Sequence, residues 1–383
     1  MQGINPPNKV FIIGGDHHNG LGLARIFGLN GIKVHAIVIS EKKRSWMASS
    51  KYVASKAIFK TEKEAFDYLL KNFSNETDKP FIIPYSDGAA MELDLRLNQF
   101  KDIFYVPSIN GEQGRIAALM NKDAQYKWAC EHGIKMARSA VIDCSFDDCL
   151  KNICEKFNFP CILKPNNSAN GSKLDIVVCD NYASLKTAVE KYKSNGYRFA
   201  IVQEYLSIDY EIDVLGGIAN GRISSIFPHK IIRRWPKGTG TSSFTQVLVD
   251  ENSIFNSKKI LSNLVEDGFN GLYDMELFKV GNEYYLNEIN FRNSGSCFRT
   301  IKQKFYYAYK WFCETVKCES PECTVPQDDC FSMTEYTDVR NIFGKSVSLW
   351  EWCCDFFKAR NYSLLMIEDI KPFFMKFLTK FVG

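Results

Sequence analysis

The pattern of apolar and polar residues in the first part of the chain predicts a parallel α/β unit. A short apolar run at 10–13 ends in two glycines, and helical spacing over 20–29 then leads to a second apolar run at 34–39. A further apolar run at 81–84 is again followed by residues with helical spacing. Strands and helices that alternate in this way indicate βαβ units. We therefore expect a first α/β domain over 1–112.

A different pattern begins near residue 113. Asn121 is a typical helix start, and the apolar face of that helix ends near Gly133. Short apolar or alternating runs then predict strands separated by polar turns and helices. The expected strands are 159–165, 176–179, 199–206 and 210–214, and the expected helices are 182–192 and 257–268. We expect a second region over 113–310 that contains a subdomain at about 135–205.

The last part of the chain, 311–383, is rich in aromatic residues and is expected to form a C-terminal extension. Its clearest helix is predicted over 350–360. A turn then precedes a final amphipathic stretch at 374–381. Because that stretch is short, we expect it to pack against the protein rather than on a membrane.

A predicted hairpin late in the second region carries the most informative polar residues. The Gly281-Asn282 step indicates a tight turn, so Glu276 before it and Glu288 after it are expected side by side. Asn290 follows on the same strand face, and paired carboxylates with an amide oxygen suit Mg²⁺. Arg292 at the strand end is then placed to neutralise phosphate charge. Taken alone, these residues also fit a solvated hairpin edge.

Two other polar segments have the character of phosphate-binding loops. The turn at 166–173 offers backbone N–H groups and a lysine that can close over nucleotide phosphates, with a plain hairpin loop as the alternative. A cation- and glycine-rich segment at 230–241 suits phosphates or a carboxylate, with a solvated surface loop as the alternative. The residues of interest in them are Gly171, Ser172, Lys173, Arg233 and Arg234.

The N-terminal turn at 14–22 has glycines before a helix but lacks the GxGxxG spacing of a dinucleotide-binding site. An NAD-dependent oxidoreductase is therefore disfavoured. His17 and His18 are predicted to be turn residues rather than metal ligands, because adjacent side chains on a loop rarely converge on one ion.

Composition narrows the class of protein. Of the 383 residues, 45% are hydrophobic and 24% are charged, which is typical of a folded globular protein. A formal net charge of +4 without a long basic run does not indicate nucleic-acid binding. The 13 cysteines are scattered through apolar stretches, and Cys313, Cys318, Cys323 and Cys330 lack a CxxC pair, so we expect buried thiols rather than zinc. Without a secretory signal or a run of about 20 apolar residues, a cytoplasmic protein is expected.

In sequence order, these segments resemble the ATP-grasp superfamily of ATP-dependent ligases. Five motifs in the same order, over about 113–305, are more specific than any one of them. They are the segments 162–165, 171–172 and 203–206, then Glu211, and then Glu276 with 288–292. The first domain is similar to a pre-ATP-grasp domain, and the closest types are D-aspartate ligase-like and carbamoyl-phosphate-synthase-like carboxylate–amine ligases. Phe291 replaces the proline of the usual Glu-x-Asn-Pro-Arg strand end, which removes no charged group.

The resemblance implies a mixed α/β and α+β fold, in which a two-lobed ATP-grasp region follows the N-terminal domain. It implies ATP and Mg²⁺ as cofactors, with Mn²⁺ as a substitute, and Glu276, Glu288 and Asn290 as metal ligands. It implies that Arg292 stabilises the transferring phosphoryl group. By position, Arg299, Arg233 and Arg234 are candidates to bind a substrate carboxylate. The implied ATP contacts are Lys122, Lys164, Gly171, Ser172, Lys173, Gln203, Glu204, Tyr205, Leu206 and Glu211.

The resulting hypothesis is a ligase for small molecules. ATP phosphorylates a carboxylate, and an amine or similar nucleophile attacks the acylphosphate, with release of ADP and phosphate. The alternative is an ATP-binding sensor or partner module that has lost catalysis, which the intact set of Glu276, Glu288 and Asn290 disfavours. The expected partners are the carboxylate and amine substrates, not nucleic acid or a membrane. A homodimer is compatible with the sequence.

Overall fold

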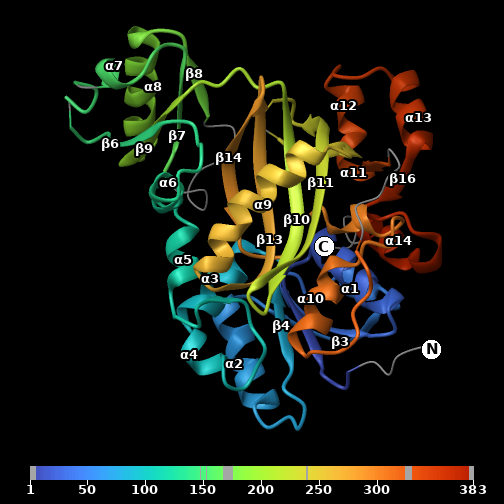
Figure 1. Ribbon diagram of the computed structural model, residues 1–383. Helices are drawn as coiled ribbons and strands as arrows, with labels where there is room; N and C mark the ends of the chain where they lie inside the picture. The colour runs from blue at the N-terminus through green and yellow to red at the C-terminus, as the bar shows by residue number, and fades with distance from the viewer. Residues whose placement is uncertain are drawn as a thin grey trace.

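The protein is described here by a computed structural model that covers residues 6–146, 148–151, 153–166, 176–238, 240–323 and 330–378. Its strands form three sheets (Figure 1). A large central sheet lies between a small sheet at the upper left of that view and the N-terminal sheet below it. This arrangement confirms the predicted mixed α/β class with a parallel N-terminal sheet.

The N-terminal sheet is parallel, with strand order β3-β2-β1-β4. Alternate residues of β1 face two different cores, with Val10 and Ile12 in one and Phe11 and Ile13 in the other. Helices therefore cover both faces of the sheet, as parallel strands require. The elements are β1 (Val10–Gly15), α1 (His18–Leu29), β2 (Val34–Ile39), η1 (Met47–Ser49), β3 (Val53–Phe59), α2 (Glu62–Phe73), β4 (Phe81–Pro84), α3 (Asp87–Leu95) and α4 (Leu97–Phe100).

The small sheet, which we call the lid sheet, is antiparallel with strand order β6-β9-β7-β8. Helix α8 begins at Asn181, whose side chain accepts a hydrogen bond from the Ser184 N–H, and it packs Leu185 and Val189 onto the sheet. The elements are β6 (Ser139–Asp143), α7 (Ile153–Lys156), β7 (Cys161–Pro165), β8 (Val177–Cys179), α8 (Tyr182–Ser194) and β9 (Phe199–Glu204).

The central sheet has eight strands in the order β14-β13-β10-β11-β12-β15-β16, with β5 paired to β13. Met275 and Leu277 of β13 pack in one core with Leu261 and Leu264 of α9. Because strand side chains alternate, Asp274 and Glu276 point to the opposite face. The elements are β5 (Ser108–Ile109), α5 (Arg115–Leu119), α6 (Lys122–Glu131), β10 (Tyr210–Ala219), β11 (Arg222–Trp235), β12 (Thr241–Val247), α9 (Glu251–Glu266), β13 (Phe269–Val280), β14 (Glu283–Asn290), η3 (Cys297–Thr300) and α10 (Tyr307–Thr315).

The C-terminal extension is part of the central sheet rather than a separate layer. Its strand β15 pairs with β12, and β16 pairs with β15. Its helices lie together at the right of Figure 1. The elements are β15 (Phe331–Met333), α11 (Glu335–Asp338), α12 (Arg340–Phe343), α13 (Leu349–Lys358), β16 (Ala359–Tyr362), η4 (Ile367–Asp369) and α14 (Lys371–Leu378). In the described part of the chain, no helix combines the length and the apolar character needed to cross a membrane.

Candidate active site

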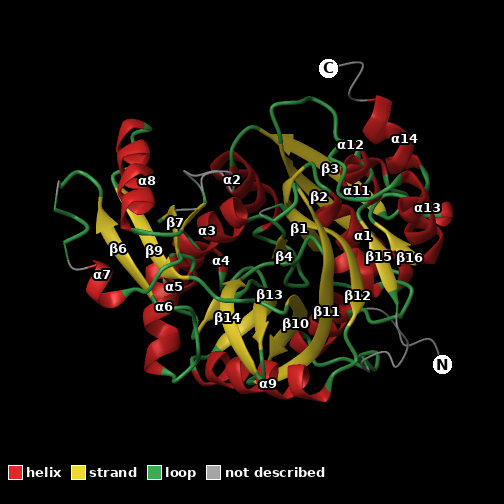
Figure 2. Ribbon diagram, turned by 90° about the horizontal axis from the view of Figure 1, so that it is seen from above, coloured by secondary structure: helices red, strands yellow, loops and turns green. Residues whose placement is uncertain are grey.

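Three neighbouring strands of the central sheet carry a row of acidic side chains on one face. In the antiparallel register, Asp213 of β10 is opposite Glu276 of β13, and Glu276 is opposite Glu288 of β14. Asn290 is two residues further along β14 and is opposite Asp274. The predicted pairing of Glu276 with Glu288 across a hairpin is confirmed. Figure 2 shows these strands beside the lid sheet, seen from above.

The electrostatics of this row favour a bound cation. Burial, followed by the negative charges of Asp213 and Glu288, raises the pKa of Glu276 to about 8. Burial also raises the pKa of Asp274. A divalent cation would relieve this repulsion, because it stabilises the ionised carboxylates. The Asn287 amide donates to Glu276 Oε2 at 3.0 Å and so orients one of the carboxylates.

The donor set fits Mg²⁺ better than a metal that is enclosed by protein. Within the described ranges, no group of three or more His, Cys, Asp and Glu side chains is arranged to hold a metal ion. Two carboxylates and the Asn290 amide oxygen leave most coordination positions open. Mg²⁺ usually binds in this way, and takes its other ligands from water and substrate phosphates.

Two lysines of the predicted ATP site lie near the acidic row. Lys164 extends from β7 of the lid sheet, and its Nζ donates to Gln203 Oε1 at 2.9 Å. Burial, followed by the positive charge of Lys122, lowers the pKa of Lys164 to about 8, whereas Glu288 and Glu276 act in the opposite direction. The two lysines and the carboxylates of the central sheet are therefore close enough to interact, and we call the region between them the cleft.

The segment between β9 and β10 links the lid sheet to the central sheet. Glu204 at its start accepts a hydrogen bond from the Arg138 N–H at 3.2 Å, and its carboxylate lies 3.5 Å from Arg138 Nε. Tyr205 is exposed and Leu206 is half-buried. Gly171, Ser172 and Lys173 of the predicted phosphate loop lie outside the described residues.

Arg233 and Arg234 point in different directions. The cation-rich segment at 230–241 is not a free loop, because its first half ends β11, whose pairing with β12 is irregular around Arg233. Arg234 pairs with Glu211 on the cleft face. Arg233 instead binds Asp338 at 2.7 Å and Asp355 at 2.8 Å, and so joins β11 to the C-terminal extension. The structure therefore does not bring Arg233 into the cleft.

Arg292 connects the acidic row to the N-terminal domain. Its Nε lies 2.8 Å from Asp87 Oδ1, and its Nη1 lies 3.0 Å from Asp274 Oδ2. The His17 side chain is exposed. Desolvation by its neighbours, followed by the positive charges of Lys376 and Arg292, lowers the pKa of its imidazole, against a hydrogen bond to Asn19. The first turn of α1 therefore lies near Arg292. His17 precedes the helix and caps it, as expected for a turn residue, but His18 is the first residue of α1 and is buried, so the prediction of a turn residue was wrong for His18.

Arg299 lies under the acidic row rather than at its surface. The side chain is 2% exposed, with Nη1 2.6 Å from His229 Nε2 and 3.6 Å from Asp213 Oδ2. Burial alone would raise the pKa of Asp213, but its hydrogen bond with His229 and the positive charge of Arg299 lower it. Burial lowers the pKa of His229 itself. Arg299 is therefore committed to His229 and Asp213, and the structure does not present Arg299 to a substrate.

Sequence reasoning missed four residues of this site, namely Asp213, Asp274, Asp87 and His229. Asp213 and Asp274 could have been found, because alternation along a strand places them on the same faces as Glu211 and Glu276. Asp87 and His229 could not, because their partners are distant in the sequence.

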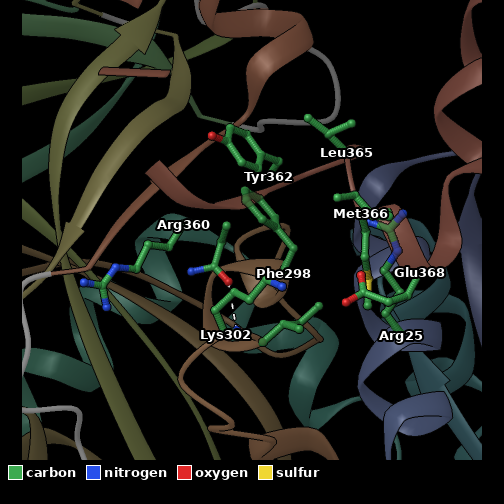
Figure 3. A pocket seen from close by; sticks show the side chains of 11 residues that line it. Arg25, Phe298, Lys302, Arg360, Tyr362, Leu365, Met366 and Glu368 are labelled. Atoms are coloured by element: carbon green, nitrogen blue, oxygen red, sulfur yellow. Dashed lines mark hydrogen bonds between the residues drawn. The ribbon is translucent and has the colours of Figure 1, made fainter. Parts of the chain in front are cut away.

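A separate cavity of about 170 Å³ lies between η3, β16 and η4, and no residue of the acidic row lines it (Figure 3). Its lining is mostly apolar, and the Arg25 guanidinium in its wall is occupied by Asp369 and by backbone carbonyl groups. We therefore place the candidate site in the cleft and not in this cavity.

Comparisons with known proteins agree with the predicted family and with the mixed α/β fold. The family model of the ATP-grasp domain matches residues 127–305. The formate-dependent phosphoribosylglycinamide formyltransferase of Corynebacterium jeikeium is 25% identical over 298 residues, or 75% of this chain and 68% of that protein. A protein of the same name from Nitratiruptor sp. is 28% identical over 175 residues, or 45% of this chain and 44% of that protein.

The fold is also found among solved structures. The N5-carboxyaminoimidazole synthetase of Staphylococcus aureus in complex with ADP superposes with a TM-score of 0.67 at 16% identity, and the match covers 90% of this chain and 88% of that chain. The order of motifs, the hairpin that pairs Glu276 with Glu288 and the family match together show that the chain contains an ATP-grasp domain.

Proposed function

We propose that this ATP-grasp ligase uses Mg²⁺ and ATP to activate a small carboxylic acid as an acylphosphate for attack by an amine. A carboxylate oxygen of the substrate attacks the γ-phosphorus and ADP leaves. The amine nitrogen then attacks the acyl carbon, loses a proton, and phosphate leaves. The observation that carries this proposal is the row of facing carboxylates beneath two lysines.

Each group in the cleft has a distinct task in this reaction. Glu276, Glu288 and Asn290 would hold Mg²⁺, which when bound supplies positive charge to the phosphates. Lys122 and Lys164 contribute charge from the lid side. Because the reaction transfers a phosphoryl group, positioning and electrostatic stabilisation suffice, and no covalent enzyme intermediate is required.

Further residues support the substrate side of the cleft. Arg292 stands between the acidic row and the first turn of α1, where its charge can stabilise the phosphoryl group in transfer. Asp87 and Asp274 fix the orientation of its guanidinium through ion pairs at 2.8 and 3.0 Å. The acceptor amine would enter beside the turn that carries His17 and Asn19.

Formate is the first acid to test, because the curated relatives are named as formate-dependent enzymes. The assay measures ADP release from ATP and Mg²⁺ with formate, acetate, and pools of amino acids and small organic acids. Hydroxylamine in the same reaction traps an acylphosphate as a hydroxamate, so it reports the intermediate without knowledge of the natural amine. We expect acid-dependent ADP release together with hydroxamate formation.

Glu288→Gln tests whether the acidic row carries the activity. The exchange removes a proposed metal ligand at nearly constant volume and should reduce ADP release by at least about 100-fold, as expected when a group that stabilises transferring charge is lost. Glu283→Gln is the matched control, because Glu283 lies on the same strand but is exposed and paired with Lys135. Mg²⁺-independent ATP binding without any acid-stimulated turnover would instead favour the sensor module.

A further inference from the structure

Helix α13 in the C-terminal extension presents an apolar stripe to solvent. Leu349, Trp350 and Phe357 are 64%, 77% and 84% exposed. Cys354 is also exposed. At about 100° per residue, these four side chains fall within an arc of about 140° around the helix axis. Exposed apolar side chains gathered in this way mark an interaction surface, unlike single exposed ones.

The stripe is held rigidly because the other face of α13 is anchored. Trp352 and Phe356 stack at 5.3 Å and pack against the small core around Met333. Asp355 adds the ion pair to Arg233 at 2.8 Å. The helix also starts with a capping box at Ser348. A helix fixed on one face cannot turn its second apolar face inward. Both views show α13 at the end of the molecule remote from the lid sheet (Figures 1 and 2).

We propose that this stripe is a self-association surface, on which α13 of a second copy of the chain packs antiparallel about a two-fold axis. A two-fold contact requires a self-complementary patch. The charges of α13 have this property, because Glu351 is in its first turn and Lys358 is its last residue. The two residues are seven apart, so they lie along the same edge of the stripe. Antiparallel packing brings Glu351 of each copy toward Lys358 of the other.

The charges of α13 also favour a second copy over a lipid surface. The helix carries two acidic residues, Glu351 and Asp355, and one basic residue, Lys358, for a net charge of −1. Helices that lie on anionic membranes are instead rich in lysine and arginine on the polar face. A ten-residue helix is also short, about 15 Å, so it covers less than the roughly 800 Å² per partner of a standard interface. The dimer should therefore be weak and depend on concentration.

The cysteines of α13 give a sharp geometric marker. The midpoint between Glu351 and Lys358 falls beside Cys354, so the two-fold axis that pairs these two charges passes close to this cysteine. Cys354 of the two copies then lie close enough for a short bismaleimide to join them. Cys130, the other cysteine classed as exposed within the described residues, is on α6 and far from this contact in sequence.

The test is sedimentation velocity of the full chain from about 5 µM to about 200 µM, where weak interfaces dissociate. We expect a monomer–dimer equilibrium. The double variant Trp350→Glu/Phe357→Glu should weaken it more than about tenfold, since buried aromatic anchors dominate interface energies. Phe255→Glu is the matched control, because Phe255 is 68% exposed on α9. Since all three side chains are mostly in solvent, unchanged circular dichroism should confirm that the variants are folded.

Cross-linking locates the contact. A bismaleimide should yield a covalent dimer that Cys354→Ser abolishes and Cys130→Ser does not. A monomer throughout the concentration range would overturn the proposal, as would a dimer that survives both the double variant and Cys354→Ser. A lipid surface is the other occupant to test. If the wild-type protein formed no dimer but co-sedimented with phosphatidylglycerol vesicles, and the double variant did not, the stripe would bind lipid and the dimer proposal would be overturned. None of these readouts depends on ligase activity.

Discussion

Replacing Glu276 by glutamine should stabilise the metal-free protein at alkaline pH while it removes activity. The carboxyl group has its pKa raised to about 8 from an ordinary value of 4.5, by burial and by the charges of Asp213 and Glu288. Glutamine resembles the protonated acid in shape and still accepts the hydrogen bond from Asn287. The variant therefore keeps the contacts of the neutral group and loses the ionised form that the fold disfavours.

The way in which stability changes with pH follows from the protons that the folded and unfolded states bind. Between about pH 4.5 and pH 8 the folded protein holds a proton on Glu276 that the unfolded chain has released, so folding is progressively less favourable as pH rises through this window. The stabilisation that the protonated Glu276 gives to the fold is fully present below this pH window and is lost above it. At about 1.4 kcal/mol per pKa unit, the rise from 4.5 to about 8 corresponds to at most about 5 kcal/mol. Water in the cleft screens the charges, so we expect about 1–3 kcal/mol.

The assay compares thermal midpoints of wild type and Glu276→Gln in EDTA at about pH 5, at the acid end of this window, and at about pH 9, above it. The two proteins should unfold together at the acidic pH. At the alkaline pH the variant should unfold higher by about 2–5 °C, given the few degrees per kcal/mol of domains this size. Mg²⁺ should then raise the midpoint of the wild type only. Glu283→Gln serves as the surface control.

Two outcomes would refute this reasoning. If Glu276→Gln lowered the midpoint equally at both pH values, the carboxylate would be stabilising in its ionised form, contrary to the repulsion inferred from the row. If Mg²⁺ stabilised the variant as much as the wild type, Glu276 would not be a metal ligand.

Three further predictions follow from other contacts. Asp369→Asn should lower the thermal midpoint, because it leaves Arg25 without its carboxylate partner. Both side chains of this pair are 1% exposed, and breaking a buried pair costs about 3–5 kcal/mol. An unchanged midpoint would contradict this prediction. Lys164→Met should weaken ATP binding in a titration, because it removes a positive charge from the proposed phosphate site. The affinity of the wild type for ATP should fall above about pH 8, as the lysine loses its proton. Equal affinities of variant and wild type would contradict this prediction. Arg233→Met should reduce stability but preserve ADP release per folded molecule, whereas Arg234→Met should reduce ADP release; the reverse pattern would contradict the opposite orientations of the two side chains.

Much of the candidate site was predictable because its central feature is local. A tight turn at Gly281 fixes the register of β13 against β14, so Glu276 and Glu288 face each other wherever the hairpin is placed. Period-two alternation then determines which neighbours share that face. Turn chemistry and alternation act over a few residues, and a sequence displays them directly.

Longer-range pairings were not predictable in this way. The ion pair of Arg292 with Asp87 joins residues 205 positions apart, and it exists because the N-terminal domain packs against the end of β14. The C-terminal extension looked helical in sequence, yet its short strands β15 and β16 complete the central sheet. Three- and four-residue strands carry too little pattern to be recognised before their partners are known.

The sequence by itself determined the family motifs, the order of strands and helices around them, and the hairpin that pairs two carboxylates, since these depend on spacing along the chain. Only the tertiary structure decided which cations reach the cleft. Arg233 faces the C-terminal extension and pairs with the buried Asp338, whereas its neighbour Arg234 faces Glu211. Burial commits Arg299 to Asp213 and His229. A side chain's direction depends on strand pairing and packing, so a charged residue in the right segment is not yet a residue in the site.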